Sequence, residues 1–118
     1  MKALKHLASI AALLSATSVF AQQDLKWADL TRTDGPALFK EKCGMCHQGG
    51  GMAMIILGRR LPTEQVPLEN RSDLQAAFIE TVVRNGFGVM YPISQGEVSK
   101  QQLASIAGYL VKKQGAKK

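Results

Sequence analysis

The sequence predicts an all-α domain with three main helices and long connecting loops. Two segments in the second half of the chain carry apolar residues at helical spacing after a capping pattern, and a shorter segment begins at a glycine-proline pair. No run alternates between apolar and polar residues as a half-buried strand does, and no internal repeat is visible. With 118 residues, the chain has room for one small domain.

The first helix is expected to begin at Gly35-Pro36 and to continue through Lys40, because proline suits a first helical turn. A second helix should follow Ser72-Asp73-Leu74-Gln75, which has a capping-box pattern, and end at Asn85-Gly86. Its expected apolar face is formed by Leu74, Ala77, Phe78, Thr81 and Val82.

The last helix is the clearest of the three. Ser99-Lys100-Gln101-Gln102 repeats the capping pattern, and an apolar stripe follows at Leu103, Ile106, Ala107, Leu110 and Val111. Residues 48–71, by contrast, are rich in glycine and proline and show no sustained period. A structureless stretch of that length needs something to organise it. Because so small a domain buries little apolar surface by itself, a large flat bound group would complete the core.

The first 21 residues are expected to form a secretory signal peptide. Lys2 and Lys5 precede an apolar run that ends in small residues at Ala21. A membrane anchor is the alternative, but the run has 14 residues and includes four hydroxyl side chains, whereas a span needs roughly 20 apolar residues. Cleavage would leave a soluble periplasmic chain without a membrane span. It would have an irregular arm at 22–34, a folded domain at 35–113 and a basic tail at 114–118.

Charge gives little indication of a partner. Loss of the signal peptide would leave 13 basic and 9 acidic residues, so the formal charge would fall from +6 to +4. Part of this excess lies at the end of the last helix, where cations favour the helix dipole. No basic face interleaved with aromatic residues appears, so nucleic-acid binding is not indicated.

The five residues Cys43-Gly44-Met45-Cys46-His47 carry the chemistry. The pattern C-x-x-C-H indicates covalent haem attachment, because one helical turn places two thiols beneath the two vinyl groups while the adjacent imidazole faces the iron. A disulfide or a redox-active C-x-x-C pair is the alternative in an exported chain. Zinc is disfavoured, because a structural site takes four ligands and the mature chain offers two cysteines and one histidine.

His47 is the predicted first axial ligand of the iron, and it is the only histidine left after removal of His6 with the signal peptide. Methionine is the usual second ligand in electron-transfer cytochromes c. Met45 lies between the cysteines, and Met52 and Met54 follow His47 closely. We therefore predict the methionine at position 90, inside the glycine-rich loop 86–92, as the second ligand; the alternative is a methionine that fills a gap in the core.

The order of helix, C-x-x-C-H, loops, helix, methionine loop and terminal helix resembles class I cytochrome c over nearly the whole mature chain. Gly35 and Phe39 precede Cys43 by eight and four residues, and Tyr109 lies on the last helix. In the family, this arrangement accompanies a crossing of the first and last helices, where glycine permits close approach and two rings fill the contact.

Two further segments, Gly58-Arg59-Arg60-Leu61-Pro62 and Val83-Arg84-Asn85-Gly86-Phe87 followed by Met90, narrow this resemblance. They are similar to the small cytochrome subunit of p-cresol methylhydroxylase and related flavocytochromes that oxidise 4-alkylphenols. The resemblance implies that Arg59 lies near a haem propionate, where its guanidinium would give charge-assisted hydrogen bonds. Arg84 is expected to be an ordinary cation at a helix end.

The chain also departs from the family pattern. Ala53-Met54 stands where family members often have Gly-Pro, whose carbonyl accepts the N–H of the axial histidine; the Met54 carbonyl is expected to serve instead. The segment from Thr63 to Ser72 looks inserted.

The functional prediction is a monohaem c-type cytochrome that is not an enzyme by itself. The resemblance implies that it is the electron-accepting subunit of an FAD-containing flavoprotein dehydrogenase and passes electrons to a downstream acceptor. A free-standing carrier between a reductase and a terminal oxidase is the alternative, since fold alone does not separate the two. Soft apolar residues at Met45 and 52–57 are expected beside the exposed haem edge, as a contact surface or partly packed under the haem.

Overall fold

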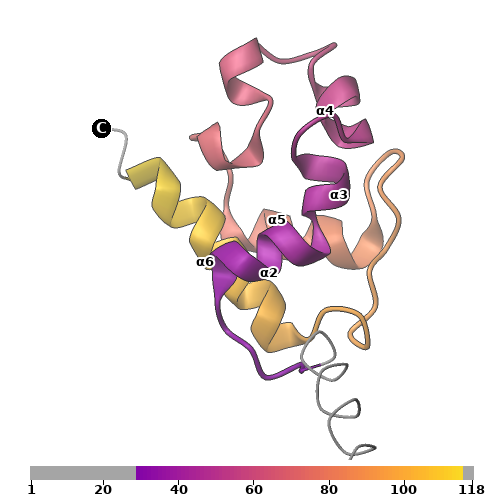
Figure 1. Cartoon of the computed structure of the whole chain (residues 1–118), viewed down its shortest axis with the longest axis vertical. Coiled ribbons are helices and arrows are strands. Elements are labelled where there is room, and N and C mark those ends of the chain that lie inside the picture. The colour runs from indigo at the N-terminus through magenta and orange to yellow at the C-terminus, as the bar shows by residue number, and fades with distance from the viewer. Residues whose placement is uncertain (1–28, 116–118) are drawn as a thin grey trace, which may run out of the picture.

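The computed structural model describes residues 29–115, with side chains through Lys112. The predicted signal peptide, residues 22–28 of the predicted arm and residues 116–118 of the predicted tail lie outside the described residues. The α-helices are α2 (Gly35–Lys42), α3 (Gly44–His47), α4 (Met52–Leu57), α5 (Ala76–Asn85) and α6 (Lys100–Gly115), with 3-10 helices η2 (Thr63–Gln65) and η3 (Leu68–Asn70) (Figure 1). Within 29–115 there is no strand, only an isolated bridge in a loop, so the predicted all-α class is confirmed.

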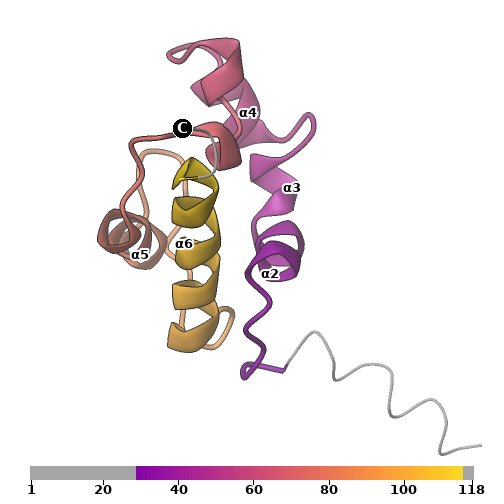
Figure 2. The same cartoon turned by 90° about the vertical axis from the view of Figure 1, so that its left-hand side faces the viewer.

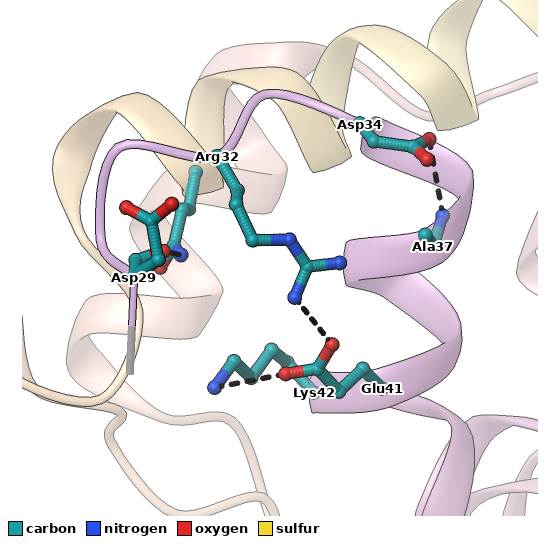
Figure 3. A network of polar contacts seen from close by, with 7 residues as sticks. Asp29, Arg32, Asp34, Ala37, Glu41 and Lys42 are labelled. Atoms are coloured by element: carbon teal, nitrogen blue, oxygen red, sulfur yellow. Dashed lines mark hydrogen bonds and ion pairs between the residues drawn. The ribbon is translucent and has the colours of Figure 1, made fainter. Parts of the chain in front are cut away.

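Helix α2 begins where the sequence predicts. The Asp34 carboxylate accepts a hydrogen bond from the backbone N–H of Ala37 at 3.4 Å, and Pro36 occupies the first turn, where its missing N–H costs nothing. The incoming chain is held to the helix by an ion pair of 2.7 Å between Arg32 and Glu41, and Lys42 approaches the other Glu41 oxygen at 3.3 Å (Figure 3). These contacts fix the direction in which α2 delivers the C-x-x-C-H residues.

The capping box predicted for the last helix is confirmed. Ser99 N–H donates to Gln102 Oε1 at 3.0 Å, and Gln102 N–H donates to Ser99 Oγ at 3.2 Å. Gln102 is completely buried, and its Nε2 donates to the carbonyl of Asp29 at 2.8 Å, while Ser99 Oγ donates to the carbonyl of Leu30 at 2.6 Å. The cap of α6 therefore also binds the end of the arm.

The predicted start of the second helix is wrong. Helix α5 begins at Ala76, its N-cap is Gln75 without a side-chain hydrogen bond, and Asp73 instead binds Arg71, with Nε donating at 2.9 Å. The Asp73 carboxylate is paired with Arg71 and therefore does not cap the helix.

The predicted apolar face of this helix is also largely wrong. Leu74 is buried, but Ile79 and Val83 form the buried face of α5, whereas Ala77, Phe78 and Thr81 are exposed. The segment is apolar on two adjacent faces, so periodicity alone does not choose between them, and packing against α6 decides.

The prediction of a structureless stretch at 48–71 is wrong as well, because α4 and both 3-10 helices lie within it. Helix α4 is apolar at all six positions and therefore shows no polar face from which a period could be detected. The chain in this region is a series of short turns.

Helices α2 and α6 pack directly against each other, with α5 on the other flank of α6 (Figure 2). A Cβ atom on Gly35 would lie 2.5 Å from the carbonyl oxygen of Ser105 and 2.8 Å from Cβ of Tyr109. The rings of Phe39 and Tyr109 lie 6.0 Å apart and tilted by 48°. This contact confirms the predicted helix crossing. The cluster of buried residues around it is Leu38, Phe39, Leu74, Ile79, Val83, Val98, Leu103, Ile106, Ala107 and Leu110.

Across residues 29–115, no helix has both the length and the apolar character needed to span a membrane.

Candidate haem-binding site

The C-x-x-C-H residues form a tight turn at the end of α2. Cys43 closes α2, since its N–H donates to the carbonyl of Phe39 at 2.9 Å, and it also stands at the N-terminus of α3. The N–H groups of Cys46 and His47 both donate to the Cys43 carbonyl, at 3.1 and 2.9 Å. One turn of backbone therefore sets the three side chains that the motif requires.

Both cysteines are free thiols, so the disulfide alternative is not what the structure contains. Cys43 packs against the hydrophobic core, and burial, with a smaller effect of Cys46, raises the pKa of the Cys43 thiol to about 11. Cysteines that act in redox exchange have a lowered pKa, because the thiolate is the nucleophile. The environment of Cys43 therefore disfavours a redox-active C-x-x-C pair.

His47 lies beside the core, with its ring 6.5 Å from that of Phe39. Burial lowers the pKa of His47, against the opposing charge of Glu69, so the imidazole is neutral at pH 7 and able to bind a metal. Its Nδ1 atom is buried and has no hydrogen-bond partner. A ring with a buried, unpartnered nitrogen is unusual unless a bound group or a rearranged neighbour completes its surroundings.

The residues after the motif turn back closely over α3. A Cβ atom on Gly51 would overlap the carbonyl oxygens of Met45 and Cys46, so only glycine fits there, and Gly49 has a φ of 57°. From the sequence, these glycines were expected only to form a loop. The triplet Gly49-Gly50-Gly51 directly after His47 was the feature that could have indicated a close backbone approach.

The predicted role of the Met54 carbonyl is not what the structure contains. This oxygen accepts the N–H of Gly58 at 2.9 Å at the end of α4, whereas His47 Nδ1 remains unpartnered. The helix α4, which was not predicted, gives this carbonyl the N–H of Gly58 as its partner, and His47 makes no hydrogen bond to it.

Met90 lies in a turn closed by two backbone hydrogen bonds, from Phe87 N–H to Met90 O at 3.1 Å and from Met90 N–H to Phe87 O at 3.0 Å. Gly86 and Gly88 adopt φ values of 77° and 60°, which glycine tolerates best. Met90 is half-buried and packs against the same core as Cys43. In Figure 2 this loop is on the same side of α6 as α5, whereas α3 is on the other side, next to α2.

Arg84 lies in the last turn of α5, as expected, but it does more than occupy a helix end. Its two terminal nitrogens donate to the carbonyls of Ile93 and Val98, at 2.9 and 2.8 Å, so the side chain is not simply a solvated helix end. The Ile93 N–H also donates to the Val83 carbonyl at 2.8 Å. Arg84 thereby holds the chain that returns from the methionine loop. A cation immediately before a glycine-rich loop was the available sequence feature.

Arg59 lies in the turn after α4 with an exposed side chain, so its predicted contact with a propionate stays a prediction. Large apolar side chains of α3, α4, α5 and the loop 86–92 are exposed, and among them Met45 is 90% and Tyr91 84% exposed. The others are Met52, Ile55, Phe78, Phe87 and Val89. Free thiols, a neutral imidazole and this apolar surface fit a haem, which is large, flat and mostly apolar.

An all-α domain that crosses its first and last helices and carries C-x-x-C-H at the end of the first has the class I cytochrome c fold. Residues 31–110 match the model of the family described as cytochrome c oxidase, cbb3-type, subunit III, and the chain belongs to this cytochrome c family. It is therefore an electron-transfer cytochrome.

The chain is also similar to the cytochrome c subunit of 4-cresol dehydrogenase (hydroxylating) from Pseudomonas putida, which confirms the narrower resemblance. The two are 31% identical over 91 residues, which cover 76% of this chain and 65% of that relative. The chain thus spans just under two thirds of the relative's length. No solved structure matches the chain significantly.

Proposed function

We propose that this chain is exported to the periplasm, carries one haem covalently and transfers single electrons without being an enzyme itself. The observation that carries the proposal is the turn at 43–47, in which two free thiols and a neutral imidazole lie within one helical turn. Membership of the cytochrome c family supports it. When bound, the haem supplies the one-electron couple.

Each residue of the site has a separate task in this proposal. Cys43 and Cys46 would hold the haem through thioether bonds, and His47 and Met90 would ligate its iron. The position of Met90 supports this choice. It packs against the core, which the half-buried Met54 does not, and Met45 and Met52 are 90% and 65% exposed. Arg59 would bind a propionate.

We further propose that the electrons come from an FAD-containing flavoprotein that oxidises 4-alkylphenols and leave for a downstream acceptor. The similarity to the cytochrome c subunit of 4-cresol dehydrogenase supports this partner. A phenol-oxidising flavin takes up two electrons, whereas one haem accepts one, so the flavin must unload in two steps. A complex that holds the haem edge near the flavin does this better than random collision.

A free-standing carrier that delivers electrons to a terminal oxidase is the second candidate. It is favoured by the description of the matching family, which names an oxidase subunit. Purification from the native host separates the two proposals: a stable complex that contains covalent or tightly bound FAD supports the first, and a cytochrome that purifies alone supports the second.

Haem attachment is tested by acid-acetone extraction of protein made in a host with c-type maturation. The wild-type protein should retain its haem, and Cys43→Ala with Cys46→Ala should lose it. Met90→Ala should abolish the weak near-infrared sulfur-to-iron band of the ferric protein, whereas Met52→Ala should retain it. Extraction-resistant haem in the double variant would contradict the attachment, and loss of the band only in Met52→Ala would reassign the ligand.

The contact surface is tested on α4, where Met52 and Ile55 are 65% and 57% exposed. Met52→Lys and Ile55→Glu should slow haem reduction by a 4-alkylphenol in stopped-flow mixing with the flavoprotein while leaving the isolated spectrum unchanged. Gln95→Lys and Gln101→Glu are matched controls, because they introduce the same charges at exposed positions elsewhere. Equal rates in all four variants would remove α4 from the contact surface.

A further inference from the structure

Two buried side-chain atoms among residues 29–112 lack a hydrogen-bond partner, and their chemistry is complementary. They are Nδ1 of His47 and Oε2 of Glu69. A neutral imidazole with Nε2 free to bind a metal carries its proton on Nδ1 and is a donor there, whereas a carboxylate oxygen is an acceptor. Buried polar atoms are rarely left unpaired, so each of the two lacks what the other offers.

The fold holds Glu69 next to the C-x-x-C-H turn. Glu69 lies in η3, whose first residue, Leu68, packs against the hydrophobic core. Gln48, the residue directly after His47, donates from its Nε2 to Glu69 Oε1 at 2.9 Å in a partly buried position. One carboxylate oxygen is therefore fixed by the neighbour of His47, and the second remains available.

The described residues give His47 Nδ1 no other acceptor. The Met54 carbonyl accepts the N–H of Gly58 and receives no hydrogen bond from His47 Nδ1. The Glu69 carboxylate is bound to the residue next to His47 and has one oxygen without a partner.

We propose that Glu69 accepts the hydrogen bond of His47 Nδ1–H in the haem-bound protein, directly or through one water, and so acts as a positioning residue for the axial histidine. This inference rests on the proposed function, in which His47 ligates the iron. Histidines that bind metals almost always donate their other ring N–H, often to a carboxylate, which fixes the tautomer and the ring orientation. The bond from Gln48 to the other carboxylate oxygen keeps Glu69 beside the turn that carries His47.

The pair has an electronic consequence for the haem. A carboxylate acceptor draws the Nδ1 proton toward itself and makes the imidazole a stronger donor to iron through Nε2. A stronger donor and a nearby negative charge both favour the ferric over the ferrous state, so Glu69 lowers the midpoint potential. A backbone carbonyl, which carries no net charge, would lower it less.

The test is Glu69→Gln in the holoprotein, with Glu64→Gln as the matched control. Glu64 is an exposed glutamate in η2 of the same segment, so its substitution makes the same change of charge away from His47. Glu69→Gln should raise the midpoint potential measured by redox titration at neutral pH, and Glu64→Gln should leave it close to that of the wild type. An equal shift in both variants, no shift in Glu69→Gln, or a shift to lower potential would overturn the proposal.

Nuclear magnetic resonance provides a second readout that a purely structural role would not change. Because the mature chain would contain a single histidine, ¹⁵N-histidine labelling of the ferrous protein reports on His47 alone. Its Nδ1–H proton should resonate further upfield and exchange faster in Glu69→Gln than in the wild type, and an unchanged resonance would contradict the hydrogen bond.

A further variant guards against a failure of Glu69→Gln to fold. Gln48→Leu removes the hydrogen bond that holds Glu69 Oε1, and it should change the His47 resonance in the same direction by a smaller amount. No change would count against the hydrogen bond between His47 and Glu69.

The proposal for Glu69 and the proposed function can fail separately. Haem that resists extraction keeps the proposed function whatever the potential does, whereas loss of haem from the wild-type protein would remove the proposed function itself.

Discussion

Two regions of the molecule differ in how completely their side chains are packed. One is the crossing of α2 and α6, and the other is formed by α3, α4 and the loop 86–92. At the crossing, protein contacts protein: Leu38 and Ala107 are fully buried, and a glycine is required for backbone contact. In the second region, Met45 is 90% and Tyr91 84% exposed, and a histidine nitrogen is buried without a partner. The crossing is complete as polypeptide, whereas the second region is complete only with a bound group. The apolar residues of a cofactor-binding region are thus selected for contact with the cofactor as well as with the rest of the chain.

Loss of haem should have the largest effect, and it should divide the molecule along this boundary. In Cys43→Ser with Cys46→Ser, amides of α3, α4 and the loop 86–92 should lose protection from hydrogen exchange, because none of their residues belongs to the buried core cluster. The slowest amides that remain should lie in α2 and α6, and far-UV circular dichroism should fall overall. Unchanged protection of α3 and α4 in the haem-free protein would contradict the comparison.

At the crossing itself, two glycines give a matched pair. Gly35→Ala places a methyl group 2.5 Å from the Ser105 carbonyl oxygen and should lower the free energy of unfolding by about 3 kcal/mol. Gly108→Ala, in α6 with open space around the position, should raise it by about 0.5–1 kcal/mol through helix propensity. Denaturant unfolding of the two holoproteins measures both. Equal stability of these variants would mean that the helices are not in backbone contact.

Arg84 lies where the two regions join, and its substitution should have an intermediate effect. Arg84→Met removes charge-assisted hydrogen bonds to two carbonyls and should cost about 2 kcal/mol of stability, with faster hydrogen exchange at Ile93. Lys100→Met removes an exposed cation at the start of α6 and should stay within about 0.5 kcal/mol of the wild type. Equal effects of the two would return Arg84 to the role of a solvated cation.

The smallest effect is expected at the most exposed apolar residue. Met45→Ala should change the free energy of unfolding by less than about 0.5 kcal/mol. Leu38→Ala, at a fully buried position of α2, should cost about 2–5 kcal/mol because it leaves a cavity. If Met45→Ala were as costly as Leu38→Ala, then Met45 would pack under the haem and would not face a partner.

The all-polypeptide region was also the part that the sequence predicted well. Ser99 and Gln102 correctly predicted the start of α6, because a capping box depends on local hydrogen bonding. The stripe from Leu103 to Leu110 is buried as expected, because it follows from helical periodicity. The start of α5 was mistaken because Ser72 and Gln75 match a capping box in sequence, yet the helix begins only at Ala76 and no side chain caps it.

The candidate site divides in the same way. The turn at 43–47 could be predicted because its chemistry lies in adjacent residues, whereas Glu69, 22 positions after His47, could not, because only the fold brings it there. The short helix α4 was missed because all six of its residues are apolar, so no polar face reveals a helical period. The hydrogen bond from Gly58 to the Met54 carbonyl was missed with it. Contacts between distant, non-periodic segments are where sequence patterns carry least information.

The buried cap of α6 has a consequence for the order in which the chain acquires its structure. Gln102 and Ser99 bind carbonyls that precede them by 73 and 69 residues, so this joint closes nearly the largest loop that the described chain allows. Closing so long a loop costs entropy that only the assembled crossing repays, and contacts of high sequence separation form late. For a chain that emerges from a translocation channel with its N-terminus first, the joint cannot form until the last helix has followed. Under the proposed export, the turn at 43–47 would leave the channel before this joint could form, and in that interval a maturation enzyme could reach the Cys43 thiol, which the folded protein partly buries.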